Sequence, residues 1–444
     1  MAHYALLCPD EAGHLLSNGE VARELVRRGH RVTVVGRAKS APLAQRLDLP
    51  LHALNIRGIR YPFHPLGWVL FAAAGAPSLA VIRDLFRFYA EEYLRLVPQA
   101  LAELKVDGVL ADHTVSAAGT AAERAGVPFV TLCSALLWHE EPEVPPPFTA
   151  WPHAQSRGAR LRNRLGYAGF HWYFGPVFRK INRWRKVWGL PPFRHFNEVY
   201  SPLAQISQLC PDFDFPRRAL PDVFHYIGSM TSGRTENGDR SFPWERLDGR
   251  PLIFASLGTV AFPANARVYH TIAQACAGLD AQVVLALGRW NEQQERLKQQ
   301  VGRLPGDHLV VEFAPQLALL DRAALLITHG GVNTVLEAVC RGVPMVVLPR
   351  NGDHFGMAAR VRHRGLGLCA SFRRTRPDAL RRLVQQVLAD DRYRSRSREV
   401  GRALLAAGGA ARAAEIAEEA LATRRPVRRG PGGELPAGFP RGRE

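Results

Sequence analysis

One ordered run, residues 313–354, holds the groups best suited to chemistry. It reads FAPQ, then THGGVNTVLEAV, then GVPMVVLPRNGDH. Gly330 and Gly331 follow a short apolar stretch, residues 323–328, and precede the helical sequence of residues 333–341. Glycines let the backbone approach a ligand closely, and the first turn of a helix presents free N–H groups with a partial positive charge. The junction therefore predicts an anion site of the kind that binds phosphate groups.

Polar side chains on this helix allow two interpretations. His329 and Asn333 would add donors to a phosphate site. Alternatively, the junction is an ordinary strand-to-helix turn in which Thr334 and Glu337 form a capping box, the pattern Ser/Thr-x-x-Glu. The pattern at this helix alone does not choose between a ligand site and a cap.

Two flanking pairs favour the ligand site. Phe313 and Gln316 precede the apolar strand, and Asp353 with His354 follows the next one, residues 344–348. Because successive parallel strands of an open α/β sheet end at the same edge, where ligands bind, these groups are expected to meet. One crevice is then predicted to hold a base, a ribose, phosphates and a sugar.

The first half of the chain offers a candidate general base, His14. A strand is predicted just before it, and a helix is predicted to begin at Ser17, with Glu20 completing a capping box. A lone histidine in a loop is more often structural than catalytic. However, another apolar strand ends in Asp112, whose carboxylate would fix the imidazole tautomer and stabilise the imidazolium above the same sheet edge.

The candidate residues of the two halves of the chain are predicted to lie on two separate α/β domains. With 444 residues and 47% hydrophobic content, the chain exceeds the size at which one core stops growing. Strands are predicted near residues 3, 31, 106 and 128, and again near 251, 282, 309, 324 and 344. No GxGxxG motif follows the first strand, which favours the second half as the nucleotide site. The predicted parts are two Rossmann-like domains (1–230 and 249–423), a polar linker (231–248) and a basic disordered tail (424–444).

The run 313–354 resembles the donor signature of the UDP-dependent glycosyltransferases with the GT-B fold, and the resemblance covers nearly the whole chain. It implies an α/β fold in which two Rossmann-like domains face a central cleft. The first would bind the acceptor and the second the UDP-sugar. The UDP-sugar is then a co-substrate, and neither a cofactor nor a metal ion is implied.

The resemblance also implies roles in the donor site. Phe313 would stack on uracil, and the Ala314 backbone would bond the edge of the base. Gln316 and Glu337 would hold the ribose hydroxyls. The diphosphate would be held by residues of the run and of the SLGT loop, namely His329, Gly331, Asn333, Thr334, Ser256, Gly258 and Thr259.

Three further positions follow from the resemblance. Asp353 would bind hydroxyls of the transferred sugar, and His354 stands where relatives that use glucose commonly have glutamine, so the sugar stays open. His14 and Asp112 match the base and its orienting acid, although the stretch reads GHLLS where relatives have GHxxP. The imidazole, whose ordinary pKa suits a base near neutral pH, would deprotonate the acceptor hydroxyl, and in-line displacement of UDP would invert the anomeric centre.

A metal-dependent class of glycosyltransferases offers a rival interpretation. Asp212 and Asp214 have the Asp-x-Asp spacing that such enzymes use. They stand among prolines, far from any nucleotide-binding pattern, and the spacing is common by chance. We therefore predict a surface turn here.

Four stretches outside the donor signature resemble the bacterial zeaxanthin glucosyltransferases. They are residues 201–209, 214–222, 254–259 and 280–286. This narrower resemblance implies transfer of glucose from UDP-glucose to the ring hydroxyl of a xanthophyll. The apolar stretch after Tyr61 and an aromatic-basic segment, residues 157–194, would form acceptor walls.

Other functions share the same signature. Macrolide, sterol and lipid glycosyltransferases have the same donor site and remain alternatives for the acceptor. A catalytically silent nucleotide-sugar or lipid-binding protein is an alternative of another class, since fold does not fix function. A UDP-sugar epimerase is a third, although it would need no aromatic acceptor walls.

The formal net charge of +18 is concentrated in the aromatic-basic segment, residues 157–194, where no acidic residue occurs. Arginine and lysine interleaved with tryptophan and phenylalanine are typical of segments that lie on anionic membranes. Nucleic acid is another partner for such a composition, and a solvated basic face with a buried aromatic side is a third interpretation. With the GT-B resemblance, the prediction is association with the inner face of a membrane and no nucleic acid partner.

The cysteines and the apolar runs of the sequence indicate the cellular compartment. Six cysteines form no CxxC pair and no zinc spacing, which predicts reduced, buried thiols in a cytoplasmic protein. No secretory signal is recognised at the N-terminus. The most apolar run, residues 67–82, is shorter than the ~20 residues that a bilayer requires and contains Pro77.

Overall fold

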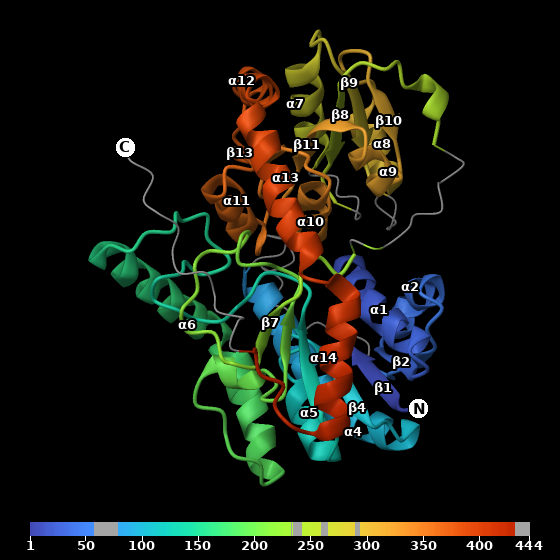
Figure 1. Ribbon diagram of the computed structural model, residues 1–444, viewed down its shortest axis with the longest axis vertical. Coiled ribbons are helices and arrows are strands. Elements are labelled where there is room, and N and C mark those ends of the chain that lie inside the picture. Colours follow the sequence, from blue (N-terminus) through green and yellow to red (C-terminus); the bar gives the residue numbers. More distant parts are fainter. Residues whose placement is uncertain (57–78, 232, 234–241, 259–264, 289–293, 431–444) are drawn as a thin grey trace.

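Two parallel sheets, each covered by helices, form the two lobes of the computed structural model (Figure 1). The structure describes residues 1–56, 79–231, 233, 242–258, 265–288 and 294–430. The first sheet has seven strands in the order β3-β2-β1-β4-β5-β6-β7, and the second has six in the order β10-β9-β8-β11-β12-β13. This architecture confirms the predicted α/β fold with two Rossmann-like halves.

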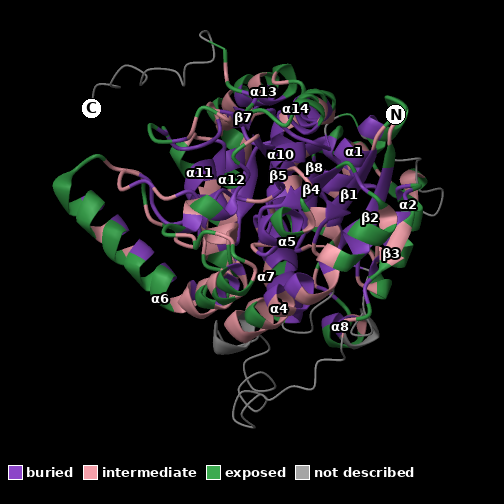
Figure 2. Cartoon of the chain, turned by 90° about the horizontal axis from the view of Figure 1, so that it is seen from below, coloured by how far each residue is buried: buried purple, intermediate pink, exposed green. Residues whose placement is uncertain are grey.

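The N-terminal lobe follows from continuous apolar strands that helices cover on both faces. Its strands are β1 His3–Leu7, β2 Arg31–Gly36, β3 Leu51–Ala53, β4 Gly108–Asp112, β5 Phe129–Cys133, β6 Gln205–Ser207 and β7 Phe224–Tyr226. Its helices are α1 Ala12–Arg27, η1 Ala38–Ser40, α2 Ala41–Arg46, α4 Leu79–Leu104, α5 Ala118–Ala125, α6 Arg157–Val187 and η2 Phe196–Val199. Figure 2 shows the strands buried and α6 at the margin of the molecule with much of its surface exposed.

The C-terminal lobe repeats the same layers. Its strands are β8 Leu252–Ser256, β9 Gln282–Ala286, β10 Leu309–Val311, β11 Ala323–Thr328, β12 Met345–Val347 and β13 Gly367–Cys369. Its helical elements are η3 Trp244–Arg246, α7 Ala266–Cys276, α8 Gln294–Val301, α9 Gln316–Leu320, α10 Val332–Cys340, α11 His354–His363, α12 Pro377–Ala389 and α13 Asp391–Ala406, followed by α14 Gly409–Thr423.

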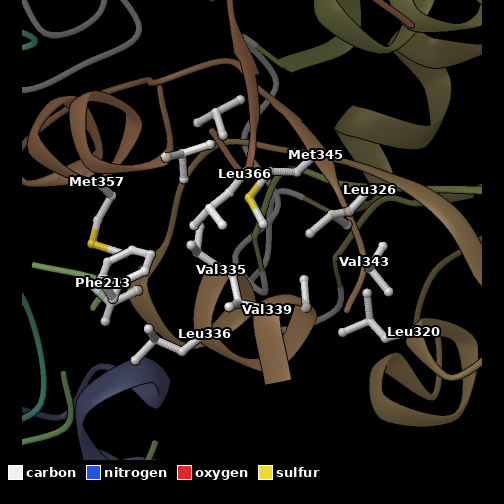
Figure 3. Close-up of a cluster of buried hydrophobic side chains, with 14 of the residues drawn as sticks. Phe213, Leu320, Leu326, Val335, Leu336, Val339, Val343, Met345, Met357 and Leu366 are labelled. Carbon is white, nitrogen blue, oxygen red and sulfur yellow. The ribbon is translucent and has the colours of Figure 1, made fainter. Parts of the chain in front are cut away.

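Helix α10 is fixed by its apolar face. Val335, Leu336 and Val339 point into a cluster with Leu326 of β11 and Met345 of β12 (Figure 3). All five side chains are fully buried, so the helix cannot turn about its axis without exposing them. This packing sets the direction in which the N-terminus of α10 faces.

The last helix, α14, packs on the first lobe although it lies within the range predicted for the second domain. Ile416, Ala417 and Leu421 belong to the core cluster that also contains β1 and α1 residues, and Figure 1 shows α14 along the N-terminal lobe. The described part of the predicted disordered tail is also docked. Val427 is buried, and its amide donates to the Leu203 carbonyl at 2.8 Å. That prediction is wrong up to Gly430, and the rest of the tail lies outside the described residues.

A buried ion cluster joins the lobes. Asp214 accepts hydrogen bonds from Arg217 at 3.2 Å and from Arg360 of α11 at 2.6 Å, and all three side chains are at most 1% exposed. Tyr226 also donates to Asp214, at 2.8 Å. The predicted surface turn at Asp212 and Asp214 is therefore wrong for Asp214, whose carboxylate is already neutralised inside the protein.

The described residues correct one further prediction and bear on several others. Helix α1 begins at Ala12, not at Ser17, so the predicted capping box with Glu20 does not form. Half of the predicted linker 231–248 and most of the apolar run after Tyr61 lie outside the described residues. The six cysteines are free thiols, four of them buried and two half-buried. Among the described helices, none combines the length and the apolar character needed to cross a membrane.

Candidate active site

A histidine and an aspartate meet at the carboxyl edge of the first sheet. His14 lies in the first turn of α1, and Asp112 is the last residue of β4. The Nδ1 atom of His14 is 3.0 Å from Oδ2 of Asp112. The His14 side chain is 22% exposed, whereas that of Asp112 is fully buried. Because Nδ1 faces the carboxylate, Nε2 is the nitrogen left to meet a substrate.

Neighbouring donors hold the Asp112 carboxylate in place. Asn18 and Ser134 donate to Oδ2 at 2.6 and 2.5 Å. The backbone N–H and the hydroxyl of Thr114 donate to Oδ1 at 2.9 and 2.5 Å. These three residues were not predicted from the sequence. Only Thr114 carried a local signal, since a residue two positions after an aspartate often bonds its side chain.

The carboxylate changes the basicity of His14. Burial alone disfavours the imidazolium, but the charge and hydrogen bond of Asp112 outweigh it and raise the pKa of His14 to about 9. Burial likewise opposes the charge of Asp112, yet His14 and the surrounding donors hold the pKa of this carboxyl well below its ordinary value. The expectation that His14 has a pKa near neutral is therefore wrong, because the pair stabilises the charged imidazole.

A cavity of about 370 Å³ lies at the ends of β8, β11 and β12. It brings together twelve of the thirteen residues predicted to bind a donor, and the remaining one, Thr259, lies outside the described residues. The twelve are Ser256, Gly258, Phe313, Ala314, Gln316, His329, Gly331, Asn333, Thr334, Glu337, Asp353 and His354. His14 also lines this cavity, whereas Asp112 lies behind it.

In the wall of this cavity, Glu337 faces Gln316. Gln316 Nε2 donates to Glu337 Oε2 at 2.6 Å and lies 3.4 Å from the Thr334 hydroxyl. The Thr231 hydroxyl donates to Glu337 Oε1 at 2.8 Å. No side-chain cap forms at the N-terminus of α10, so the capping-box interpretation of Thr334 and Glu337 does not hold. Glu337 is a buried acceptor beside the glutamine.

The His329 ring, also in the wall of this cavity, lies close to two glycines, Gly258 after β8 and Gly331 at the start of α10. A Cβ atom at Gly258, whose φ is 105°, would lie 3.2 Å from the ring, and one at Gly331 would lie 2.8 Å from its Nε2. Only glycine lets both backbone segments approach the imidazole this closely. Burial lowers the pKa of His329 well below its ordinary value, so the ring is neutral and acts as a hydrogen-bonding group.

Asn333 connects the two lobes across the cavity. Its Nδ2 donates to the Gly13 carbonyl at 2.7 Å, and its Oδ1 accepts from Ser17 and Gln208, each at 3.0 Å. Ser17, expected as a helix cap, also donates to the Gly13 carbonyl at 2.6 Å. The amide of Asn333 therefore brings α10 against the turn that carries His14.

Asp353 and His354 lie where α11 begins. Oδ2 of Asp353 accepts from the Leu136 amide of the first lobe at 3.3 Å. The ring of His354 meets that of His329 edge to face, with centroids 4.6 Å apart. Burial, and secondarily the charge of Arg350, lowers the pKa of His354 to about 4. His354 is therefore a neutral group in the wall of the cavity.

A second, larger cavity of about 900 Å³ adjoins the first. Aromatic side chains form much of its lining, namely Phe86, Tyr89, Tyr93, Trp138, Phe148, Phe170, Trp172, Tyr173, Phe174 and Phe355. Trp138 lies 5.4 Å from Phe148 and 5.5 Å from Phe174 between ring centroids. The segment 157–194, which was predicted to form an acceptor wall, supplies four of these residues, and its role in binding an acceptor stays a prediction. The others are spread too widely along the chain for any spacing to reveal.

The two cavities meet at the histidine. Glu11, His14, Ala135 and Asp353 line both of them. The His14 imidazole and the Asp353 carboxylate of the opposite lobe thus stand between the smaller cavity and the aromatic one, with Asp112 behind the imidazole. Within the described residues, no group of three or more histidine, cysteine, aspartate or glutamate side chains is arranged to hold a metal ion.

Comparison with known proteins agrees with this architecture. The family model described as UDP-glucoronosyl and UDP-glucosyl transferase matches residues 94–401. The zeaxanthin glucosyltransferase of Pantoea ananas is 35% identical over 97% of this chain and 99% of its own length, and that of Pseudescherichia vulneris is 32% identical over 95% and 98%. The crystal structure of the glycotransferase of kitacinnamycin, 24% identical, superposes with a TM-score of 0.73 over 95% of this chain and 99% of its own, which establishes the GT-B fold. With a family match over most of the chain and two relatives above 30% identity along nearly its whole length, this protein belongs to the family of UDP-glucuronosyl and UDP-glucosyl transferases.

Proposed function

We propose that this glycosyltransferase moves a hexose, with glucose as the first candidate, from a UDP-sugar to a hydroxyl of a carotenoid such as zeaxanthin. The observation that carries the proposal is the position of His14 and Asp353 at the junction of the two cavities. A donor in the polar cavity and an acceptor in the aromatic cavity would meet at the imidazole. Among the described residues, Glu11 is the one other titratable residue that lines both cavities.

The chemical step uses the free nitrogen of His14. Nε2 takes the proton of the acceptor hydroxyl while its oxygen attacks the anomeric carbon, and the bond from that carbon to the β-phosphate oxygen of UDP breaks. Attack opposite the leaving group inverts the anomeric centre. Asp112 stabilises the imidazolium that forms, because its buried carboxylate lies 3.0 Å from Nδ1.

The charge of the departing UDP is met by protein groups. The uncapped N-terminus of α10 presents backbone N–H groups, and neutral His329 adds a hydrogen bond beside Gly331. Gln316 and Glu337 provide a paired donor and acceptor for the ribose hydroxyls. A scheme of this kind needs no metal ion, and we propose that the transfer is metal-independent.

The acceptor is inferred from the larger cavity and from the relatives. A volume of about 900 Å³ with aromatic walls suits a long, rigid, apolar molecule that carries a terminal hydroxyl. Two relatives that exceed 30% identity along nearly the whole chain are zeaxanthin glucosyltransferases. A carotenoid with a ring hydroxyl has this chemistry, since the polyene is apolar and the reacting group stands at its end.

The test is incubation with UDP-glucose, other UDP-sugars and dTDP-glucose against hydroxylated carotenoids, a macrolide and a sterol, with products read by mass. We expect a gain of one or two hexoses on the carotenoid with UDP-glucose. The variant His14→Ala should lose transfer while binding UDP with unchanged affinity. UDP binding without transfer to any acceptor by the wild-type protein would instead indicate a silent binding protein. Transfer confined to the macrolide or the sterol would overturn the acceptor.

A further inference from the structure

We propose that the outward face of α6 docks on an anionic lipid bilayer and presents the aromatic cavity to it. The docking surface is defined by Leu161, Leu165 and Trp172 together with the exposed basic residues of the same helix. Docking does not depend on the reaction that the protein catalyses. Delivery of an acceptor through this surface does rest on the proposed function.

The docking surface is apolar where a surface helix is normally polar. Leu161, Leu165 and Trp172 are 59%, 65% and 80% exposed, among the highest values for large apolar side chains of the described residues. Their spacing of four and seven residues places them on one face of the helix. The opposite face is also apolar and is buried in the first lobe, through residues such as Phe170 and Phe174. Helix α6 therefore has a second apolar face, which is exposed and does not pack into the core of the first lobe.

Exposed cations surround this apolar face, and the segment has no acidic residue to neutralise them. From Val144 to Asn197 the sequence contains no aspartate or glutamate. The exposed basic residues at helical positions near the apolar face are Arg157, Arg164, Arg179, Arg183 and Lys186. Apolar side chains within a ring of arginine and lysine match the interface of a bilayer that carries negative headgroups.

The docking surface is continuous with the aromatic cavity. Trp172 is mostly exposed and also lines that cavity, next to Gly169, Phe170 and Tyr173. Figure 2 shows α6 at the margin of the molecule, where a flat surface can reach it. An apolar acceptor dissolved in the bilayer could then enter the cavity beside Trp172 without crossing water.

The apolar centre of the face favours a bilayer over nucleic acid. A phosphate backbone would engage the arginines, but it would leave Leu161 and Leu165 in water. Insertion into the headgroup region buries these side chains, and the hydrophobic gain adds to the electrostatic attraction. A second copy of this strongly basic helix would meet like charge.

Flotation with lipid vesicles tests the proposal. The wild-type protein is expected to float with vesicles of phosphatidylglycerol and phosphatidylcholine at low salt, and to float less with phosphatidylcholine alone or at high salt. Leu161→Glu/Leu165→Glu should weaken binding by about tenfold or more, because it removes apolar area and adds negative charge. The matched control is Val26→Glu/Leu405→Glu, which changes charge equally at exposed sites on α1 and α13 and should float like the wild type.

Activity separates this proposal from the previous one. Leu161→Glu/Leu165→Glu should lose transfer to a vesicle-embedded acceptor while retaining transfer to the same acceptor in detergent micelles. If the protein floats with vesicles but transfers no sugar, the proposed function is contradicted and the docking proposal is not affected. The docking proposal is overturned if the wild type ignores anionic vesicles, if both double variants float equally, or if RNA binds where vesicles do not. Loss of a dimer in Leu161→Glu/Leu165→Glu, with flotation intact, would assign the face to self-association instead.

Discussion

The two cavities that meet at His14 are built by different means. The smaller one takes eleven of its 26 lining residues from one run, residues 313–354, and uses glycines, a helix N-terminus and the hydrogen-bonded pair of Gln316 and Glu337. The larger one takes aromatic side chains from residues 86 to 174 and from Phe355. A polar ligand needs groups at fixed positions, whereas an apolar ligand needs volume and shape. Substitutions should therefore change donor binding sharply and acceptor binding gradually.

The largest effect is expected where the cavities join. His14→Ala removes the base and should lower kcat by about 10³-fold or more, within the range that general base catalysis supplies. Because the donor cavity stays intact, the Kd for UDP should stay within about twofold of the wild-type value. Steady-state kinetics and calorimetry with UDP measure the two quantities. His113→Ala is a useful control, since His113 stacks 6.4 Å from His14 but lines neither cavity. Equal loss of activity in both variants would argue against His14 as the base.

The next effect concerns the acid behind the base. Asp112→Asn removes the charge that raises the pKa of His14 to about 9, while burial continues to lower it. In the wild type, kcat/KM should rise with pH toward about 9, because the base must be neutral. In Asp112→Asn this limb should shift to lower pH, and kcat should fall by about 10²-fold. An unchanged limb would show that another group controls the profile.

The same pair links stability to pH. The raised pKa of His14 contributes stability that is fully present below its unfolded value near 6.5 and is lost as pH rises through about 9. The lowered pKa of Asp112 contributes stability that is present above its unfolded value and is lost in acid. Denaturant unfolding of the wild type and of Asp112→Asn at several pH values should show this alkaline loss only in the wild type.

In the smaller cavity, Glu337→Gln tests whether a single substitution changes UDP affinity without changing acceptor binding. The change keeps the shape of a buried side chain that accepts from Thr231 and Gln316. Loss of a charge-assisted hydrogen bond, worth about 1.5 kcal/mol, should raise the Kd for UDP about tenfold. The KM for the acceptor should not move. A change in acceptor KM without a change in UDP affinity would contradict the assignment of this cavity.

In the aromatic cavity, Phe148→Ala should change the KM for the acceptor and not the affinity for UDP, the reverse of what is expected for Glu337→Gln. Phe148 lines the larger cavity and packs 5.4 Å from Trp138 and 5.5 Å from Phe170 between centroids. Removal of its ring should raise the KM for a carotenoid acceptor by about tenfold, from the lost apolar contact. UDP affinity should be preserved. Phe148→Leu, which retains much of the side-chain volume, should raise the acceptor KM less than Phe148→Ala does. A larger rise with Phe148→Leu would contradict a role of Phe148 in acceptor binding.

The smallest expected effect is that of a chelator. If backbone N–H groups of α10 and His329 meet the diphosphate, EDTA should leave the rate unchanged. Rates measured with EDTA and with added Mg²⁺ or Mn²⁺ provide the check. A loss that the divalent ion restores would mean that the donor cavity needs a metal ion to bind the diphosphate.

Much of the smaller cavity, which we propose binds the donor, was predictable because its sequence signals are local. The strand predicted at residues 323–328 coincides with β11, and the helix predicted from residue 333 begins one residue earlier as α10. A short apolar stretch, two glycines and a helical pattern each depend on neighbours in the chain. The carboxyl edges of parallel strands then bring such junctions together by a general rule.

Local signals failed where distant groups took over. Ser17 and Glu20 had the spacing of a capping box, but Ser17 lies inside α1, where its hydroxyl bonds Gly13 and Asn333. Asp214 had the surroundings of a surface turn, but Arg360 reaches it from the other lobe. Helix α14 follows the second domain in sequence and yet completes the core of the first. In each case a partner far along the chain decided the outcome.

The sequence by itself determined the two α/β halves, the glycine-rich junction between β11 and α10 and the pairing of a histidine with an acid, because periodicity, glycine and residue type act over a few positions. Only the tertiary structure decided that both cavities share His14, that Asn18, Thr114 and Ser134 hold Asp112, and that burial and charge set the pKa of His14. Electrostatics and cavity shape depend on distances between residues that no pattern in the chain connects.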